Sequence, residues 1–181
     1  MILFFGPPGA GKSVQGQLLA ARHNWRWLSS GQLLRDAHDA ELLQQMQTGK
    51  LIDNKKATKI VFDAIKRSKD IDHLIIDGFP RQLEQAKWLV ETQPEHERSI
   101  ALVVILEVPQ HELMRRLKLR GRTDDVEEII AERMQTHRAE IYPILTYLTD
   151  QHVRIAHIDG NGTVGQVHDR IEAELEACKL V

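Results

Sequence analysis

Short apolar runs alternate along the chain with longer segments in which apolar residues recur every three or four positions. The apolar runs predict β-strands buried in a sheet. They lie at residues 2–5, 25–29, 74–77, 100–106 and 153–158. The clearest is 100–106 (IALVVIL), because an unbroken apolar run is typical of a strand that is covered on both faces.

The segments between these runs have the periodicity of amphipathic helices. We expect helices at residues 12–23, 83–90, 110–119, 125–148 and 163–178. Pro109 precedes the third of them and is a residue that suits a first helical turn. At the start of the longest helix, Asp125 and Glu128 lie three residues apart, which predicts a variant of the capping box.

Strands that alternate with helices in this way predict βαβ units and a parallel sheet. We therefore expect an α/β fold of three layers, with a central parallel sheet of about five strands and helices on both faces. In such sheets, ligands bind beyond the carboxyl ends of the strands. Gly6, Ser30, Asp77 and Asp159 come at or just after the ends of predicted strands. The ligand site is therefore expected at that edge of the sheet.

Composition limits the class of protein without identifying it. The chain has 181 residues, of which 42% are hydrophobic and 28% charged, and no repeat or linker divides it. We expect a single domain over residues 1–181. A net charge of -2 gives no general attraction to nucleic acid or acidic membranes. The N-terminal apolar run is shorter than that of a signal peptide, so we expect a cytoplasmic protein without a nucleic-acid or membrane partner.

Residues 6–13 (GPPGAGKS) match the phosphate-binding pattern G-x-x-x-x-G-K-[ST] in full. The glycines let backbone N–H groups point inward at phosphates, and the helix that follows adds its positive N-terminal end. Lys12 supplies a mobile cation for the β- and γ-phosphates, and Ser13 can ligate Mg²⁺. A glycine turn of purely structural use would not need the lysine. The motif therefore predicts that the protein binds ATP with Mg²⁺.

Asp77 closes the apolar run LIID. Proteins with this phosphate loop place an Asp at the end of a neighbouring strand, close to the metal. Because Gly78 and Pro80 follow directly, Asp77 could instead cap a turn or a helix. Beside the phosphate loop, the metal interpretation is favoured. We expect Ser13 and Asp77 to hold Mg²⁺, partly through water.

Further motifs resemble those of the adenylate kinase family and occur in the same order over nearly the whole chain. The phosphate loop and Gln15 are followed by SSGQLLR (29–35), GKLI (49–52), DGFPRQLEQA (77–86), RLKLRGRTDD (116–125) and Arg133. The most specific part is DGFPR with a Gln four residues after its Arg. The resemblance implies a P-loop kinase that reversibly transfers a phosphoryl group from Mg-ATP to AMP, giving two ADP. It also implies a monomer, with a monophosphate-binding arm at 31–52 and a lid at 120–125.

The resemblance implies a role for each matching residue. The ATP-binding set is Gly6, Gly9, Ala10, Gly11, Lys12, Ser13, Val14, Arg116, Arg120 and Gly162. The AMP-binding set is Ser30, Arg35, Ile52, Gly78, Arg81, Gln85, Arg122 and Arg133, with Gln85 bonded to the adenine. The catalytic set is Lys12, Arg81, Arg116, Arg120, Arg122 and Arg133.

Physical chemistry supports an arginine-rich site for this reaction. Two polyanions must be brought together, and the planar fork of Arg binds phosphate oxygens in pairs. The acceptor phosphate is already anionic, so catalysis can rest on positioning and charge neutralisation without a general base. We assign no role to any of the nine histidines. Taken singly, Arg116 or Arg133 could equally belong to a solvated helix face.

The sequence departs from the family pattern in four places. Ser13 and Val14 replace the usual Gly–Thr, and Gln32 replaces an Asp near the magnesium water shell. The arm is shorter than usual, and the lid is shorter even than in short-lid members of the family. The lid has no Cys and so cannot be of the zinc-carrying type. Because a lid excludes water, we hypothesise that trimming reduces discrimination or raises wasteful ATP hydrolysis.

Three alternatives stay open at this point. The first is a kinase for UMP or CMP, although Gln82 follows Arg81 where such relatives usually carry Asn. The second is a nucleotide-binding protein with little catalysis, which Gln32 and the short loops would favour. The third is a kinase for a small metabolite.

Overall fold

Five parallel strands form the centre of the computed structural model, which describes residues 1–47, 54–92, 98–121 and 125–181. The strands are β1 (Ile2–Phe5), β2 (Arg26–Ser29), β3 (Leu74–Asp77), β4 (Leu102–Glu107) and β5 (Ile155–Asp159). Their order in the sheet is β2-β3-β1-β4-β5, and every neighbouring pair is parallel. The predicted parallel sheet of five strands is confirmed.

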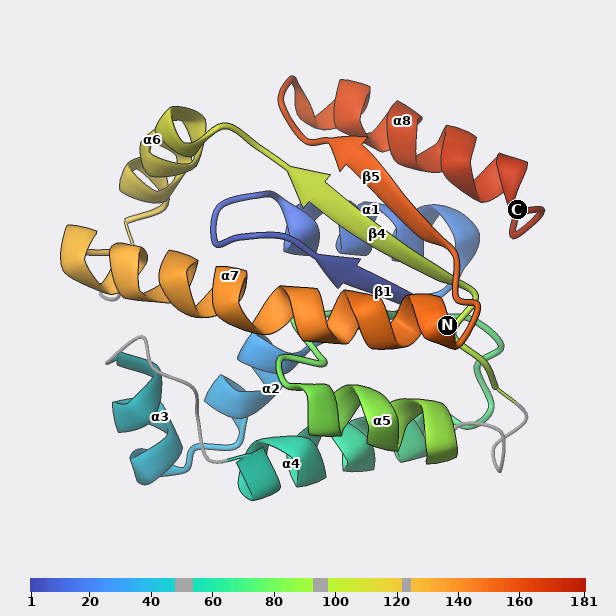
Figure 1. The fold of residues 1–181 in the computed structure, drawn as a ribbon, viewed down its shortest axis with the longest axis horizontal. Coiled ribbons are helices and arrows are strands. Elements are labelled where there is room, and N and C mark those ends of the chain that lie inside the picture. The colour runs from blue at the N-terminus through green and yellow to red at the C-terminus, as the bar shows by residue number, and fades with distance from the viewer. Residues whose placement is uncertain (48–53, 93–97, 122–124) are drawn as a thin grey trace.

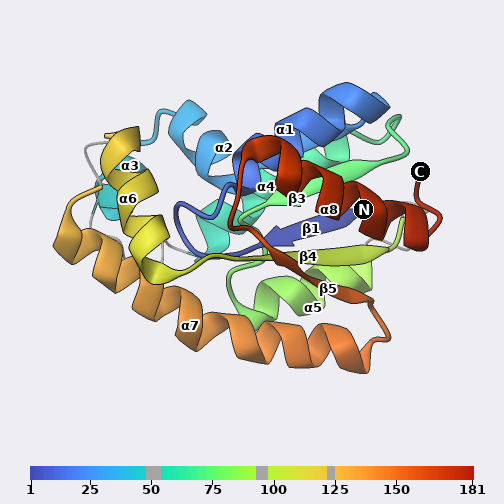
Figure 2. The same cartoon turned by 90° about the horizontal axis from the view of Figure 1, so that it is seen from above.

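Helices cover both faces of this sheet. They are α1 (Lys12–His23), α2 (Ser30–Asp36), α3 (Ala40–Gln47), α4 (Asn54–Arg67), α5 (Leu83–Thr92), α6 (Gln110–Arg120), α7 (Glu127–Asp150) and α8 (Val164–Ala177). Seen from above, α1 and α8 lie on one side of the sheet, and α5 and α7 lie on the other (Figure 2). The three-layer α/β architecture expected from the sequence is therefore confirmed (Figure 1).

Side chains point alternately to the two faces of the sheet, and this explains how continuous apolar runs form two separate cores. In β1, Ile2 and Phe4 belong to the core that α1 and α8 cover, whereas Leu3 and Phe5 belong to the core beneath α4, α5 and α7. Successive side chains of a strand point to opposite faces, so a strand between two helical layers must be apolar throughout. This is the physical reason for the runs seen in the sequence.

The sheet order brings two predicted site segments together. β1 is the central strand, and its carboxyl end is in register with that of β3, with Phe4 opposite Asp77. The phosphate loop follows β1 directly, so it lies beside Asp77. The chain continues from β3 to β4 on the other side of β1, and ligands of open α/β sheets bind where the strand order switches in this way.

The start of α7 differs from the sequence prediction. α7 begins at Glu127 with Val126 at its N-cap and without a side-chain cap, so the predicted capping box of Asp125 and Glu128 is wrong. The reason is that the Asp125 carboxylate is only 1% exposed and forms an ion pair with Arg120. The predicted start of α6 is confirmed, since the helix begins at Gln110 with Pro109 at its N-cap.

The helices α2, α3 and α4 lie between β2 and β3, a segment in which no helix is predicted from the sequence. Ser29 is the N-cap of α2, and its hydroxyl accepts a hydrogen bond from the backbone N–H of Gln32. A small core of Leu34, Leu42 and Ala57 joins the three helices. Ser29 was a recognisable cap residue, so α2 could have been predicted.

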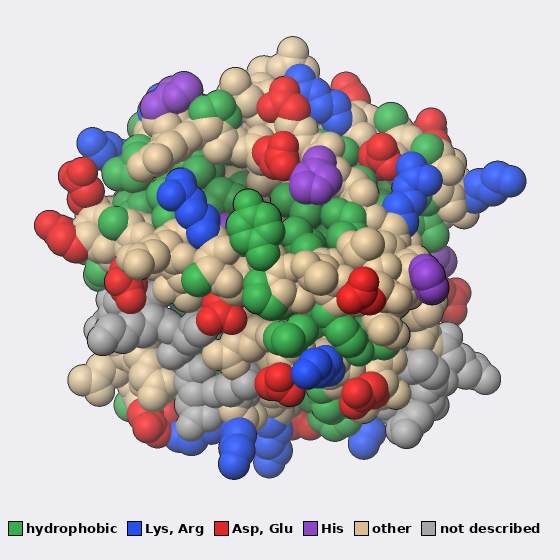
Figure 3. Space-filling model, in the orientation of Figure 1, with side chains coloured by type: hydrophobic (Ala, Val, Ile, Leu, Met, Phe, Trp, Pro, Cys, Tyr) green, Lys and Arg blue, Asp and Glu red, His purple; other side chains and the backbone are tan. Residues whose placement is uncertain are grey.

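The surface of the molecule carries mixed charges. On the face that Figure 3 shows, acidic and basic side chains are interspersed and do not segregate by sign, in keeping with the net charge of -2. None of the helices in the described ranges is long and apolar enough to cross a membrane.

Candidate active site

The loop between β1 and α1 has the backbone that its glycines predict. Gly9 and Gly11 have φ angles of 84° and 99°, in the left-handed region that favours glycine. A Cβ on Gly6 would lie 2.8 Å from the carbonyl oxygen of Leu106, so a larger residue would displace the loop from β4. The loop therefore wraps tightly over the ends of the strands, and Gly11 leads into the N-terminus of α1.

The side chain of Lys12 folds back over this loop. Its Nζ donates hydrogen bonds to the carbonyl oxygens of Gly6 at 2.7 Å and Pro7 at 3.0 Å. Burial, and then the positive charges of Arg81 and Arg120, lower the pKa of Lys12 to about 8, although Asp77 acts in the opposite direction. The ammonium group is partly buried and lies near other cations, so an anionic ligand would relieve this repulsion.

Ser13 and Asp77 form a direct contact at the base of the loop. The Ser13 hydroxyl donates a hydrogen bond of 2.5 Å to Oδ2 of Asp77, and Asp77 is 4% exposed. Both groups are hard oxygen ligands of the kind that Mg²⁺ prefers. Within the described part of the chain, no group of three or more His, Cys, Asp or Glu side chains could hold a metal by itself. One carboxylate and one hydroxyl suit Mg²⁺, which usually completes its shell with water and substrate phosphates.

A second group of predicted residues surrounds the turn after β3. The Gly78 carbonyl accepts hydrogen bonds from the Ser30 hydroxyl at 2.6 Å and from Nε of Arg81 at 2.7 Å. Gly78 has a φ of 76°, and a Cβ there would lie 2.9 Å from the Ser30 hydroxyl. This turn therefore fixes the position of Arg81. Burial lowers the pKa of Arg81, with a further contribution from Arg133 and Arg35 opposed by Asp77.

Gln85 supports the same turn from α5. It is 6% exposed, its Oε1 accepts a hydrogen bond from the Arg81 backbone N–H at 2.7 Å, and its Nε2 donates to Thr58 at 3.3 Å. It lines a small pocket of about 30 Å³ together with Ser30 and Gly78. Gln85 and Ser30 are therefore next to the main cavity but are not among the residues on its wall.

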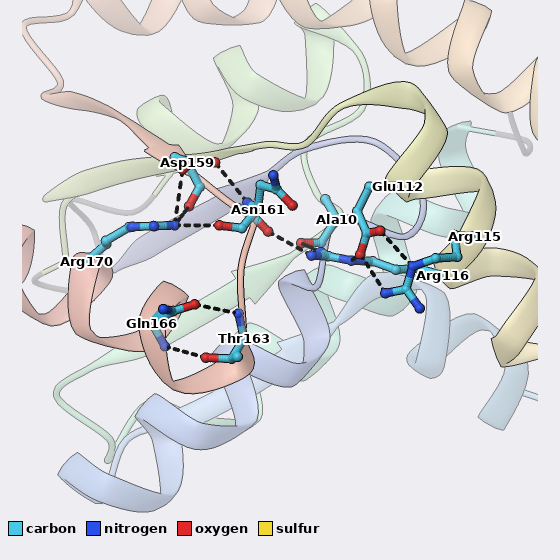
Figure 4. A network of polar contacts seen from close by, with 10 residues as sticks. Ala10, Glu112, Arg115, Arg116, Asp159, Asn161, Thr163, Gln166 and Arg170 are labelled. Atoms are coloured by element: carbon cyan, nitrogen blue, oxygen red, sulfur yellow. Dashed lines mark hydrogen bonds and ion pairs between the residues drawn. The ribbon is translucent and has the colours of Figure 1, made fainter.

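On the opposite side, α6 carries Arg116 to the phosphate loop. Its Nη2 donates to the Gly160 carbonyl at 3.0 Å, and its Nε donates to Glu112 at 2.8 Å (Figure 4). Glu112 also accepts hydrogen bonds from Arg115 at 2.7 and 2.8 Å. The bonds from Arg115 and then Arg116 lower the pKa of Glu112 to about 2. Glu112 is not among the predicted site residues, although an acid four residues before an Arg on a helix is a recognisable pair.

The loop after β5 is held from both ends, as Figure 4 shows. Nη1 of Arg170 donates to the carbonyl oxygens of Asp159 at 2.6 Å and Asn161 at 2.8 Å. Thr163 and Gln166 form a complete capping box at the start of α8. Gly162, with a φ of 138°, lies between these two fixed points. The sequence placed Gly162 in the site but gave no sign of Arg170.

Two predicted arginines lie against Asp125. Nε of Arg120 is 2.8 Å from Oδ2 of Asp125, and Arg133 lies 4.0 Å from its Oδ1. Arg133 also donates to the Met46 carbonyl at 3.3 Å and so touches the end of α3. Arg122 and Ile52, which the sequence also assigned to the site, lie outside the described residues.

Gln32, the departure that could weaken metal binding, lies at the surface. Its Nε2 donates to Asp36 at 2.7 Å, and its Oε1 accepts from Arg35 at 3.3 Å. Gln32 is exposed and is not among the described residues of the cavity wall, whereas Arg35 is. The Gln32 side chain therefore contacts Arg35 and does not itself line the cavity.

One cavity of about 670 Å³ joins these parts. The predicted residues on its wall are Gly6, Gly9, Ala10, Gly11, Lys12, Ser13, Val14, Arg35, Asp77, Gly78, Arg81, Arg116, Arg120, Arg133 and Gly162. The wall also includes three polar residues of α7 that are not among the predicted site residues, Thr136, His137 and Glu140. Its volume lies within the range of small-molecule sites. Arginines from four different segments therefore face one space next to the phosphate loop.

Comparison with known proteins gives a consistent result. A family model described as adenylate kinase matches residues 4–153. The chain is 35% identical to an adenylate kinase of Mycolicibacterium paratuberculosis, over 93% of this chain and 95% of that protein. It is 36% identical to one of Synechococcus, over 96% and 97% of the two chains. It is 35% identical to one of Thermus thermophilus, over 96% of both. The similarity thus extends over nearly the full length of each relative.

Proposed function

The chain belongs to the adenylate kinase family, and on that basis we propose that it reversibly transfers a phosphoryl group from Mg-ATP to AMP, giving two ADP. Relatives that carry this name match almost the whole chain, which favours an adenylate kinase over a kinase for UMP, CMP or a small metabolite. We further propose a single kinase domain that acts as a monomer in the cytoplasm.

The observation that carries the proposal is the shared cavity. The phosphate loop with Lys12 lines one part of its wall, and Gly78, Arg81 and Arg35 line another. A protein that only binds ATP needs the first part. A second group of phosphate-binding cations on the same wall supports a site for two phosphorylated ligands, since the reaction requires the two to meet.

On the donor side, we assign the α-, β- and γ-phosphates of ATP to the backbone N–H groups of the loop and to Lys12. Arg116 and Arg120 lie along α6 at the wall of the cavity and would neutralise charge on the polyphosphate. On the acceptor side, Arg81 and Arg35 would grip the AMP phosphate, with Arg133 close to both. Within this scheme the residues position and neutralise, and no base has to remove a proton from the anionic acceptor.

Phosphoryl transfer from ATP normally uses Mg²⁺. We propose that Ser13 and Asp77 hold this ion, because their oxygen atoms meet at the base of the loop. The ion would supply charge neutralisation at the phosphates. Gln32 does not weigh against this assignment, since its side chain is engaged with Arg35 and Asp36.

The preference for AMP is assigned to Gln85. Its amide already bonds to the Arg81 backbone and to Thr58, so adenine would have to share or replace these partners. The arm at 31–52, which includes α2 and α3, would close over the acceptor. The segment 120–125 would serve as a reduced lid.

The proposal is tested by product formation from Mg-ATP with AMP, UMP, CMP, GMP or no acceptor in parallel. We expect ADP to form fastest with AMP, at a rate far above that without acceptor. Faster transfer to UMP or CMP would assign the chain a different monophosphate. ATP binding without transfer to any acceptor would mean that the chain is a nucleotide-binding protein with little catalysis.

A further inference from the structure

One face of α7 forms a wall of the cavity. Its lining residues are Arg133, Thr136, His137, Glu140, Ile141 and Ile144, which recur at three- and four-residue steps. Among the described residues of the wall, His137 carries the one imidazole. The family assignment gives this residue no function, and the mechanism above does not use it.

The ring of His137 has no hydrogen bond to any described residue of the protein, although it is partly buried. A neutral imidazole offers one N–H donor and one acceptor nitrogen. On the wall of a ligand cavity, these two atoms are available to a bound molecule.

The surroundings of His137 are strongly cationic. Lys12 of the phosphate loop, Arg81 of the turn after β3 and Arg138 of its own helix all act electrostatically on the ring. The other charged residues on the cavity wall are Arg35 of α2, Asp77 of β3, Glu112, Arg115, Arg116 and Arg120 of α6, and Arg133 and Glu140 of α7. Burial, and then the charges of Lys12, Arg81 and Arg138, lower the pKa of His137 to about 4. In the free protein the ring is therefore neutral at physiological pH.

Lys12 belongs to the donor part of the wall and Arg81 to the acceptor part, and His137 is within electrostatic range of both. We infer that His137 is a phosphate ligand at the point where the donor and acceptor meet, and that it takes up a proton from solvent when the two nucleotides bind. This inference rests on the proposed function. Bound phosphates replace the positive potential around the ring by a negative one, which favours the imidazolium. The charged ring then donates a hydrogen bond to a phosphate oxygen, which is a stronger bond than a neutral imidazole makes.

The inference fixes the direction of a pH effect. The ring is neutral in the free protein above about pH 4 and protonated in the complex up to a higher pH. Between these two values, binding includes the uptake of a proton from water or buffer. The affinity for the nucleotide pair therefore increases as the pH falls through this range.

Calorimetry at about pH 6, in buffers of different ionisation enthalpy, measures this proton directly. The ligands are AMP and a non-hydrolysable ATP analogue with Mg²⁺. The proteins are the native chain, His137→Asn, and His111→Asn, in which an exposed histidine of α6 is replaced. Protonation of the nucleotides is the same with all three. We expect the native chain and His111→Asn to take up as much as about one proton more than His137→Asn. Equal uptake by the three proteins, with binding retained, would overturn the inference.

A second measurement uses only the native chain, in case His137→Asn does not fold. NMR titration of the His137 ring should give a midpoint near pH 4 without ligand and above 6 with both nucleotides bound. A midpoint that does not move would refute the inference. Phosphoryl transfer from Mg-ATP to AMP is assayed separately on the same protein preparation. If transfer occurs and the His137 midpoint does not move, the inferred role of His137 is refuted and the proposed function stands. If the protein neither binds the nucleotides nor transfers phosphate, the role of His137 and the proposed function are both refuted.

Discussion

The hydroxyl of Ser13 lies 2.5 Å from Oδ2 of Asp77, although 64 positions separate the two residues in the chain. The contact exists because β1 and β3 are neighbours in the sheet and end at the same level. It joins the last residue of the phosphate loop to the single buried aspartate at the ends of the described strands.

This contact gives the first prediction. Asp77→Asn keeps the shape of the side chain and removes its charge, so it should lower the apparent affinity for Mg²⁺ and the turnover by about 10- to 100-fold. The measurement is the rate of ADP formation as a function of Mg²⁺ concentration. Asp70→Asn, at an exposed position, is the matched control. An unchanged Mg²⁺ dependence in Asp77→Asn would contradict the assignment of Asp77 to the metal.

The second prediction concerns Glu112 as a residue that positions Arg116. Removing its carboxylate in Glu112→Ala frees the Arg116 side chain from its contact on α6. A loss of about 1 kcal/mol in the binding free energy of ATP should raise the KM for ATP about fivefold, while the KM for AMP stays constant. Steady-state kinetics with each substrate varied measures both constants. Glu84→Ala removes a carboxylate that is 72% exposed and serves as the control. If Glu112 merely repelled ATP through its charge, the variant would bind ATP more tightly, and that outcome would exclude the positioning role.

The third prediction concerns the choice of acceptor. Gln85→Leu removes the amide assigned to adenine, so the KM for AMP should rise about tenfold or more, while turnover falls by less. Kinetics with AMP and with UMP should show a smaller preference for AMP than in the native protein. The side chain also bonds to the Arg81 backbone, so the Tm of the variant is measured beside that of Gln17→Leu, an exposed control. A variant that is folded and has the native AMP dependence would show that Gln85 does not recognise the base.

The fourth prediction is a pH dependence of stability. The pKa of His137 is about 4 in the folded protein and about 6.5 when the chain is unfolded. Between these values the unfolded state binds the proton and the folded state does not. The free energy of unfolding should therefore decrease as the pH falls from about 6.5 to 4. Urea unfolding at several pH values in this range should show a smaller decrease for His137→Asn. Parallel curves for the two proteins would mean that the ring is not held neutral in the fold.

The fifth prediction follows from the length of the lid. The segment from Arg120 to Asp125 is too short to cover much of a bound nucleotide, so water should reach the transferring phosphoryl group. We expect ATP hydrolysis without AMP at a measurable fraction of the transfer rate. Release of inorganic phosphate from Mg-ATP alone is the assay. A rate that is negligible beside transfer to AMP would show that the short lid excludes water adequately.

Local sequence patterns predicted those elements that depend on residues close together in the chain. Apolar runs identified the five described strands, and the runs are continuous in β1 and β4, where burial on both faces requires apolar residues. Gly6 to Ser13 could be interpreted from sequence alone, since the positive φ angles of Gly6, Gly9 and Gly11 favour glycine. Asp77 was found because it ends a strand, and strand ends in a parallel sheet gather at one edge.

What could not be predicted depends on contacts between distant segments. Asp125 has the sequence of a helix cap, but its buried ion pair with Arg120 arises only when α6 and α7 meet. Arg170 holds a loop eleven residues earlier in the chain, and His137 reaches the cavity only through the packing of α7. The partners of these residues are set by tertiary structure and leave no local pattern.

The central claim is that one cavity brings two nucleotides together for direct transfer. Incubating the protein with Mg²⁺ and ADP alone, followed by ³¹P NMR, tests it most directly. Direct transfer predicts ATP and AMP in equal amounts with little inorganic phosphate, and loss of nearly all conversion in Lys12→Ala. Formation of AMP and phosphate without ATP, or no conversion by native protein that binds ADP, would contradict the account.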